Sequence, residues 1–272
     1  MAGDEDDPHL AALQRGFGEG MLFGLPALDA PLQGVVPGQL FLVAGPPSGG
    51  KTQLSMHLLL QNRKRRIIWI TPDETHGFVI RKLLCIEHGL TMAEAKRWVE
   101  TRDPRVRRFT QSLTGLVFGE SGKRDDIQKL TDEAARRWGE PPELIGLDYV
   151  GRLRLGDYET PVSQKVDWLK ETAIAFNTRI LALHQSNRGG INPPRDPRGR
   201  MAPPTMADIR EAGEAESFQI VWCRRGDGIG GRKANEVWVL KNKWNPESID
   251  QCHTFFVERG GRYVGISGRR PE

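Results

Sequence analysis

Residues 45–52 of this chain read Gly45-Pro46-Pro47-Ser48-Gly49-Gly50-Lys51-Thr52. They match the spacing G-x-x-x-x-G-K-[ST], in which glycines let backbone N–H groups point at phosphate oxygens beside the positive end of a helix. In such loops the lysine reaches the β- and γ-phosphates of a nucleotide, and the hydroxyl of the last residue binds Mg²⁺. We therefore expect the eight residues to bind a nucleotide, with these two roles taken by Lys51 and Thr52.

The residues on either side of this loop have the patterns of a buried strand and of a helix. Gln39–Ala44 is short and apolar, as expected of a buried parallel strand. Gln53–Gln61 places Leu54, Leu58 and Leu59 at helical spacing. A strand, this loop and a helix, in that order, form the context in which the motif binds phosphate.

Composition sets broad limits on the class of protein. A length of 272 residues allows one large α/β domain or two small ones, and a net charge of +4 permits a polyanionic partner without proving one. The three cysteines, Cys85, Cys223 and Cys252, form no metal-ligand pattern, which favours a reduced protein of the cytoplasm. The acidic start is no signal peptide and no apolar run is long enough to cross a bilayer, so we expect a soluble protein with no membrane partner.

Strands and helices alternate along the rest of the chain, and we expect a flexible acidic tail over residues 1–17 and one α/β domain over 18–272. The sheet should be mostly parallel, flanked by helices, with antiparallel strands at the carboxyl-terminal end. A basic turn is expected around Arg105, Arg107 and Arg108, and a helix starting at Pro161 with Thr160 as its cap. Further strands are predicted at Ile67–Ile70, Leu116–Phe118, Leu144–Asp148, Arg179–His184, Phe218–Cys223, Glu236–Lys241, Thr254–Val257 and Tyr263–Ile266, and further helices at Phe78–Glu87, Met92–Glu100 and 125–138.

Hydrolysis of a nucleotide requires polar side chains near the loop in addition to phosphate binding. Asp148 ends an apolar strand at the sheet edge where α/β proteins bind ligands, so we expect it to hold Mg²⁺ with Thr52. Asp73 and Glu74 both end the second strand, which lies beside the first if the sheet is doubly wound, and the sequence leaves open which of them is the catalytic base. Gln185 ends a further strand and is a candidate to hydrogen-bond the γ-phosphate.

The order of these motifs is informative. The phosphate loop is followed by the acid-ended strand at Asp148-Tyr149, and then by Ala182–Arg188, which reads A-L-H-Q-S-N-R. The most specific stretch is Met206–Glu216, which reads M-A-D-I-R-E-A-G-E-A-E and is similar to S-D-L-R-E-S-G-x-I-E of DnaB-type replicative helicases. Over roughly residues 20–268 the chain resembles the motor domain of that family, in a compact form like those of phages and plasmids. The resemblance implies a RecA-like fold and an ATP- and Mg²⁺-dependent helicase that assembles as a ring, as a homohexamer, and translocates on single-stranded DNA in replication.

The resemblance also implies roles for individual residues. Lys241 and Lys243 fall where the family has a Lys-x-Arg pair that reaches the γ-phosphate of the neighbouring subunit. Because Lys243 stands where the family has arginine, it supplies charge without a bidentate fork, and Arg232 is an alternative finger. The family's glutamate at the end of the second strand aligns with Asp73. The family's amino-terminal domain, which contacts primase and the loader, has no counterpart before residue 20, and primase is a further candidate partner.

In this family DNA contacts come from loops that line the central hole of the ring. The matching loops here are Gly151–Glu159 and Ser186–Pro204. Arginine-rich loops can follow a phosphate backbone without reading bases, so we expect little sequence preference on single-stranded or forked DNA. The candidate contacts are Arg152, Arg154, Arg188, Arg195, Arg198 and Arg200.

Two other functions remain open at the level of sequence. One is a DNA-dependent ATPase similar to RecA or KaiC, which forms filaments or rings for recombination or annealing. The other is a nucleotide-switched subunit that binds DNA or recruits primase with little turnover, an alternative that the lysine at position 243 keeps open.

Overall fold

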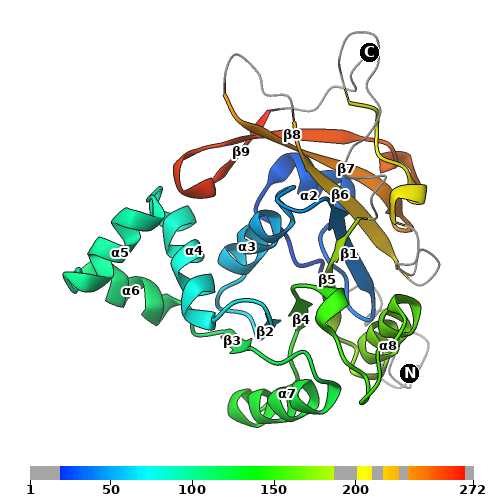
Figure 1. The fold of residues 1–272 in the computed structure, drawn as a ribbon, viewed down its shortest axis with the longest axis horizontal. Helices are drawn as coiled ribbons and strands as arrows, with labels where there is room; N and C mark the ends of the chain where they lie inside the picture. The colour runs from blue at the N-terminus through cyan, green and yellow to red at the C-terminus, as the bar shows by residue number, and fades with distance from the viewer. Residues whose placement is uncertain (1–18, 187–200, 210–216, 227–231, 267–272) are drawn as a thin grey trace, which may run out of the picture.

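A twisted sheet runs through the computed structural model, which describes residues 19–186, 201–209, 217–226 and 232–266 (Figure 1). Within these residues the sheet has nine strands in the order β3-β2-β4-β5-β1-β6-β7-β8-β9. All pairs from β3 to β6 are parallel, and β6 to β9 pair antiparallel. The strands are β1 (Leu40–Gly45), β2 (Ile67–Ile70), β3 (Leu116–Gly119), β4 (Leu144–Leu147), β5 (Arg179–Gln185), β6 (Gln219–Arg225), β7 (Ala234–Asn242), β8 (Cys252–Val257) and β9 (Tyr263–Ile266).

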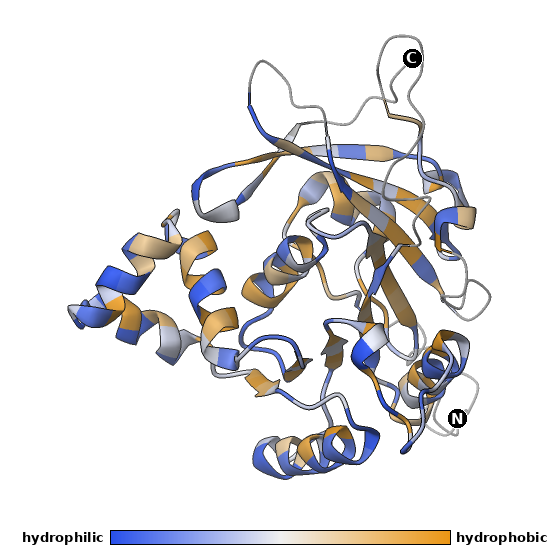
Figure 2. Ribbon diagram, viewed as in Figure 1, coloured by the Kyte–Doolittle hydropathy of each residue, from blue (hydrophilic) through white to orange (hydrophobic). Residues whose placement is uncertain are grey.

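Helices cover both faces of the sheet, and this explains why the central strands are apolar along their whole length. Every residue of β1, β2 and β4 is buried. One core cluster joins the sheet to α3 and α4, and a second joins it to α7 and α8; Figure 2 shows the apolar residues gathered along these contacts. The helices are α2 (Pro26–Leu32), α3 (Lys51–Gln61), α4 (His76–His88), α5 (Met92–Glu100), α6 (Pro104–Ser112), α7 (Arg124–Trp138) and α8 (Val162–Ala175).

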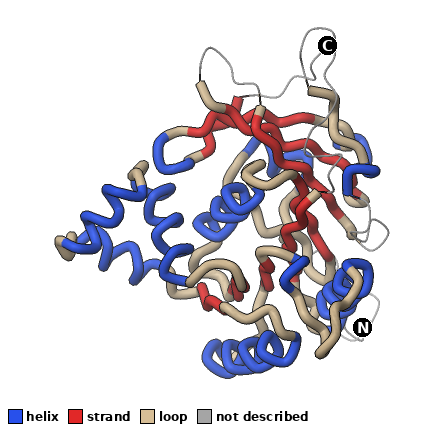
Figure 3. Tube along the Cα trace, viewed as in Figure 1, coloured by secondary structure: helices blue, strands red, loops and turns tan. Residues whose placement is uncertain are grey.

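The basic turn predicted around residues 105–108 is wrong, because these residues belong to α6. Asp103 caps this helix by accepting a hydrogen bond from the backbone N–H of Arg105 at 2.9 Å, and Pro104 is its first residue. Phe109 is the residue of α6 that is buried, and it packs edge-on against His88 of α4. Helices α4 to α6 therefore form a group of their own at one side of the molecule (Figure 3).

Two further expectations need correction. Strand β2 does not lie beside β1, because β4 and β5 intervene between them. Thr160 does not cap α8: the cap position is Pro161, which has no side-chain acceptor, and the Thr160 hydroxyl instead donates to the carbonyl of Tyr158 at 3.5 Å. The other predicted strands and helices of the described residues are found within a few residues of their expected limits, and the α/β fold class is confirmed.

The described helices differ from membrane-spanning segments. None of them combines the length and the apolar character that crossing a bilayer requires.

Candidate nucleotide-binding site

The phosphate loop connects the carboxyl end of β1 to the first turn of α3. Its backbone takes positive φ angles at Gly45 (146°), Ser48 (58°) and Gly50 (102°), of which the first and last favour glycine. A Cβ atom at Gly45 would clash with the carbonyl oxygen of Cys223 on β6, so the backbone of this neighbouring strand packs directly against the loop. Backbone conformation and close packing thus both require glycine at position 45. The loop leads directly into the amino-terminal end of α3, whose free N–H groups can bind an anion.

Lys51 is folded back onto the loop that it terminates. Its Nζ donates to the carbonyl oxygens of Gly45 at 2.9 Å and Pro46 at 2.8 Å. Burial lowers the pKa of Lys51, and the charge of Asp148 opposes part of that shift. An ammonium group held by two neutral carbonyls is well placed to exchange them for anionic phosphate oxygens, which are stronger acceptors.

Thr52 and Asp148, which lie far apart in the sequence, meet beside the loop. The Thr52 hydroxyl donates to Oδ2 of Asp148 at 2.8 Å. Burial raises the pKa of Asp148, the hydrogen bond from Thr52 opposes this shift, and the nearby charge of Glu74 adds to it. A hydroxyl and a carboxylate side by side are hard oxygen donors of the kind that bind Mg²⁺ next to a nucleotide, so these two residues fit the predicted ion.

The two candidate bases, adjacent in sequence, have different surroundings. Lys82 of α4 donates to both carboxylate oxygens of Glu74, at 2.6 and 2.7 Å. Asp73 instead pairs with Nε of Arg152 at 2.7 Å, in the short helix η2 (Val150–Arg152) after β4. The charge of Glu74 also contributes to the raised pKa of Asp148, after burial.

A cavity of about 660 Å³ opens beside the phosphate loop. Residues from Ser48 to Gln53 form one wall, and the opposite wall comes from β6, β7 and β8. The motif gives no sign of this opposite wall, because its residues come from distant strands and from the residues just before β7. They include Arg225, Arg232, Lys233, Asn235 and Val257. Arg232 also lies over the ring of Phe256 at 3.8 Å, so its guanidinium has an aromatic support.

Gln185 lies at the same end of the parallel strands as the loop, since it is paired in register with Gly45, and its side chain is exposed.

The two lysines, Lys241 and Lys243, lie at the opposite end of the strands. Lys241 is opposite Ile220 on β6, and the backbone N–H of Lys243 donates to the carbonyl of Phe218 at 3.1 Å. From Phe218 to Cys223, which supports the phosphate loop, the chain spans about 17 Å at the usual rise per strand residue. Lys243 therefore cannot reach the phosphates of its own subunit.

Two of the predicted DNA contacts lie in the described part of the chain. Arg152 is half exposed despite its ion pair with Asp73. Arg154 follows it, and its backbone N–H donates to the carbonyl of Gly122 at 2.8 Å, which fixes the start of the loop. The other four, Arg188, Arg195, Arg198 and Arg200, fall outside the described residues, as do residues 210–216 of the predicted family stretch.

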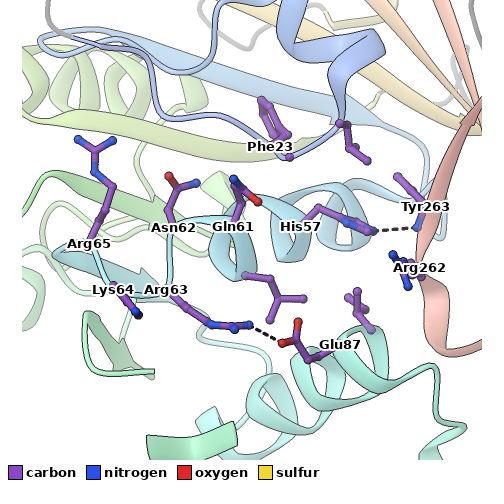
Figure 4. Close-up of a pocket in the computed structure, with 14 residues that line it drawn as sticks. Phe23, His57, Gln61, Asn62, Arg63, Lys64, Arg65, Glu87, Arg262 and Tyr263 are labelled. Atoms are coloured by element: carbon purple, nitrogen blue, oxygen red, sulfur yellow. Dashed lines mark hydrogen bonds and ion pairs between the residues drawn. The ribbon is translucent and has the colours of Figure 1, made fainter. Parts of the chain in front are cut away.

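A second cavity of about 660 Å³ lies at the opposite end of α3 (Figure 4). Its cations include Arg63, which pairs with Glu87 at 2.7 Å. The hydrogen bond between Tyr263 and His57 closes one side of it. This cavity has no phosphate loop and none of the predicted metal ligands, so the nucleotide site is assigned to the cavity beside Lys51.

Comparison with known proteins identifies the relatives of this fold. The model of the family described as "DnaB-like helicase C terminal domain" matches residues 20–254. A solved structure described as an "ATPase Domain" has a TM-score of 0.73 at 16% identity, with 95% of this chain and 96% of that chain covered. Another, "The Structure Of A DnaB-Like Replicative Helicase And Its Interactions With Primase", has a TM-score of 0.73 at 17% identity, with 97% and 68% covered. These matches confirm the RecA-like fold and the resemblance found in the sequence.

Proposed function

Because this chain belongs to the family of DnaB-like helicase C-terminal domains, we propose that it is an ATP-dependent, ring-forming DNA helicase that translocates on single-stranded DNA in replication. The observation that carries this proposal is the 2.8 Å contact between Thr52 and Asp148 beside Lys51. It unites a phosphate-binding loop with a metal-binding acid, which a nucleotide-binding protein needs in order to hydrolyse ATP.

In the proposed reaction the chain positions ATP and stabilises charge. The N–H groups at the start of α3 bind phosphate oxygens, and Lys51 leaves its two carbonyl partners to neutralise the β- and γ-phosphates. Thr52 and Asp148 would hold Mg²⁺, which when bound would supply charge that stabilises the transferring phosphoryl group. We assign Glu74 as the base that orients the attacking water and accepts its proton, because its charge acts on Asp148, and Gln185 as a donor to the γ-phosphate.

The second part of the proposal concerns assembly. The lysines at the opposite sheet edge lie too far from their own loop, and this supports a role toward the next subunit of a ring. A head-to-tail contact that closes on itself generates such a ring, and it places one subunit's edge against the next subunit's site. We assign Lys243 to the γ-phosphate of the neighbour, with Lys241 beside it.

The third part concerns DNA. Arg152 belongs to a loop predicted to contact the strand, and its ion pair with Asp73 joins that loop to the end of β2. A DNA phosphate that binds Arg152 would compete with Asp73 for its guanidinium. Binding of the DNA strand would then change the ion pair of the residue next to Glu74. A relative with this fold is described together with primase, and primase is accordingly a candidate partner here.

The test measures ATP hydrolysis and unwinding of a forked duplex. Lys51→Ala should lower turnover by about 10²–10³-fold, the usual cost of one charge-stabilising donor. Asp148→Asn should bind nucleotide but lose Mg²⁺-dependent turnover, and Glu74→Gln should lose turnover where Asp73→Asn retains it. Glu87→Gln is the matched control, because this carboxylate pairs with Arg63 in the second cavity.

Each outcome has a definite meaning. Near wild-type rates in Lys51→Ala or Asp148→Asn would contradict the assigned site. Strand exchange or annealing without unwinding would favour the RecA- or KaiC-like alternative. Nucleotide binding without turnover in the wild-type protein, with and without single-stranded DNA, would favour the switched subunit.

A further inference from the structure

The hairpin formed by β8 and β9 is attached to the side of α3. Tyr263, the first residue of β9, is buried with its ring stacked between His57 of α3, at 4.9 Å, and Phe255 of β8, at 5.5 Å. Its backbone N–H donates to Nε2 of His57 at 3.0 Å, as Figure 4 shows. The turn before it is also attached, since the Gln53 side chain donates to the carbonyl of Gly261. The last strand is thus fastened to the helix that begins at the phosphate loop.

The Tyr263 hydroxyl connects this hairpin to the loop itself. It accepts a hydrogen bond from Nδ2 of Asn235 on β7 at 2.6 Å, and it donates to the carbonyl oxygen of Gly50 at 3.3 Å. The same carbonyl also accepts from the backbone N–H of Leu54 at 2.8 Å within α3, so the Tyr263 hydroxyl is its second donor. Gly50 is the last glycine of the loop and the cap residue of α3. A Cβ atom at Gly50 would clash with both the Asn235 amide and the Tyr263 hydroxyl, so the two side chains pack directly against this glycine.

The planarity of the peptide bond gives this contact a consequence for ligand binding. The carbonyl of Gly50 and the N–H of Lys51 belong to one peptide unit and, in the trans form, point in opposite directions. The two hydrogen bonds to the carbonyl, from Leu54 within α3 and from Tyr263 outside it, therefore also fix the direction of the Lys51 N–H, one of the first donors of α3. These are the donors that face a phosphate bound at the helix start.

We propose that Tyr263 and Asn235 are positioning residues that, in addition to the α3 hydrogen bond from Leu54, hold the Gly50–Lys51 peptide in its phosphate-binding orientation. This inference rests on the proposed function, because it takes the loop to bind ATP. Tyr263 does not line the cavity beside the loop, so its hydroxyl acts on the nucleotide through Gly50 and not by contact. Asn235 does line that cavity, which makes Tyr263 the cleaner position to test.

The coupling works in both directions, because linkage between two sites is reciprocal. If the hairpin orders the loop for ATP, then bound ATP stabilises the docked hairpin. Amide hydrogens of residues 259–266 should therefore exchange more slowly when nucleotide is present. Removing the Tyr263 hydroxyl should weaken this protection while the ring of residue 263 still packs against His57 and Phe255.

The decisive variant is Tyr263→Phe, which deletes one hydroxyl and keeps the ring. We expect Kd for a non-hydrolysable ATP analogue and KM for ATP to rise up to about tenfold, as for the loss of one buried hydrogen bond, with kcat unchanged. Thr131→Val is the matched control: it removes a buried hydroxyl that donates to Ile127 at 2.8 Å on α7, away from the site. The control should leave Kd, KM and hairpin protection at wild-type values.

Exchange measurements on the wild-type protein keep the test valid if Tyr263→Phe does not fold. An unchanged Kd and KM in the folded variant, or a wild-type hairpin that ATP does not protect, would overturn this inference alone. A wild-type protein that binds no ATP would overturn the proposed function and this inference together. The two failures are therefore distinguishable.

Discussion

Mixing two inactive variants gives the sharpest test of Lys243. Lys51→Ala disables the phosphate loop of its own subunit, and Lys243→Ala removes the charge that we assign to the neighbour's site. Lys243 lies about 17 Å along the strand direction from the residue that supports its own loop, far beyond the reach of a lysine side chain. Its loss should therefore leave the subunit's own loop intact.

The expected recovery follows from counting interfaces. In rings formed at random from equal amounts of the two variants, an interface works when the loop comes from a Lys243→Ala subunit and the lysine from a Lys51→Ala subunit. Each condition holds with a chance of one half, so about one quarter of the interfaces carry a complete site. Neither parent ring contains such an interface. A cationic finger supplied by a neighbouring subunit can be worth about 10³-fold in rate.

Steady-state ATPase measurements on the mixture test this expectation. Activity should approach about a quarter of the wild-type rate, well above the sum of the parents. A mixture of Lys51→Ala with Asp148→Asn is the control, because both defects lie in one subunit's own site and no interface can be complete. If native mass spectrometry shows mixed rings and activity does not recover, Lys243 does not act across the interface. Lys243→Arg should keep or raise turnover, because a guanidinium binds phosphate bidentately.

Two further predictions concern DNA and pH. Replacing Arg195, Arg198 and Arg200 by Ala should lower the slope of log K against log salt for binding of single-stranded DNA by roughly 2, since each lost phosphate contact contributes roughly 0.7. Basal ATPase activity should persist. An unchanged slope would show that this loop does not contact DNA. Burial lowers the pKa of His57 and of His184 from 6.5 to about 4, so only the unfolded chain takes up these protons between those values. The free energy of unfolding should therefore fall as the pH drops from 6.5 to 4, by about 3 kcal/mol per histidine, and a flat profile in urea titrations would contradict the two burials.

The sequence predicts individual strands better than their order. Ile67–Ile70 is apolar at every position, which indicates a strand buried on both faces, and β2 is such a strand. The same pattern contains no information on neighbours: a doubly wound order would place β2 beside β1, whereas it lies between β3 and β4. Helix α6 was missed because Phe109 is its one buried residue, although the Asp103-Pro104 pair is a recognisable helix start.

The candidate site divides in the same way. The conformation of the phosphate loop depends on glycines within eight residues, so its motif can be recognised locally. The different surroundings of Asp73 and Glu74 depend on Arg152 and Lys82, which come from other elements and have no fixed spacing from β2. The wall formed by β6 to β8, and the contact of Tyr263 with Gly50, likewise arise from pairing of distant strands and leave no local signature.

Strand β7 connects the separate parts of the site. At one end Asn235 contacts Tyr263 beside the phosphate loop, and at the other end the strand carries Lys241 and leads into Lys243. It pairs with β6, with an irregularity between Ile220 and Val221, and its first half pairs with β8. One strand thus carries both a side chain packed beside the phosphate loop and the lysines that we assign to the neighbour's site in the proposed ring.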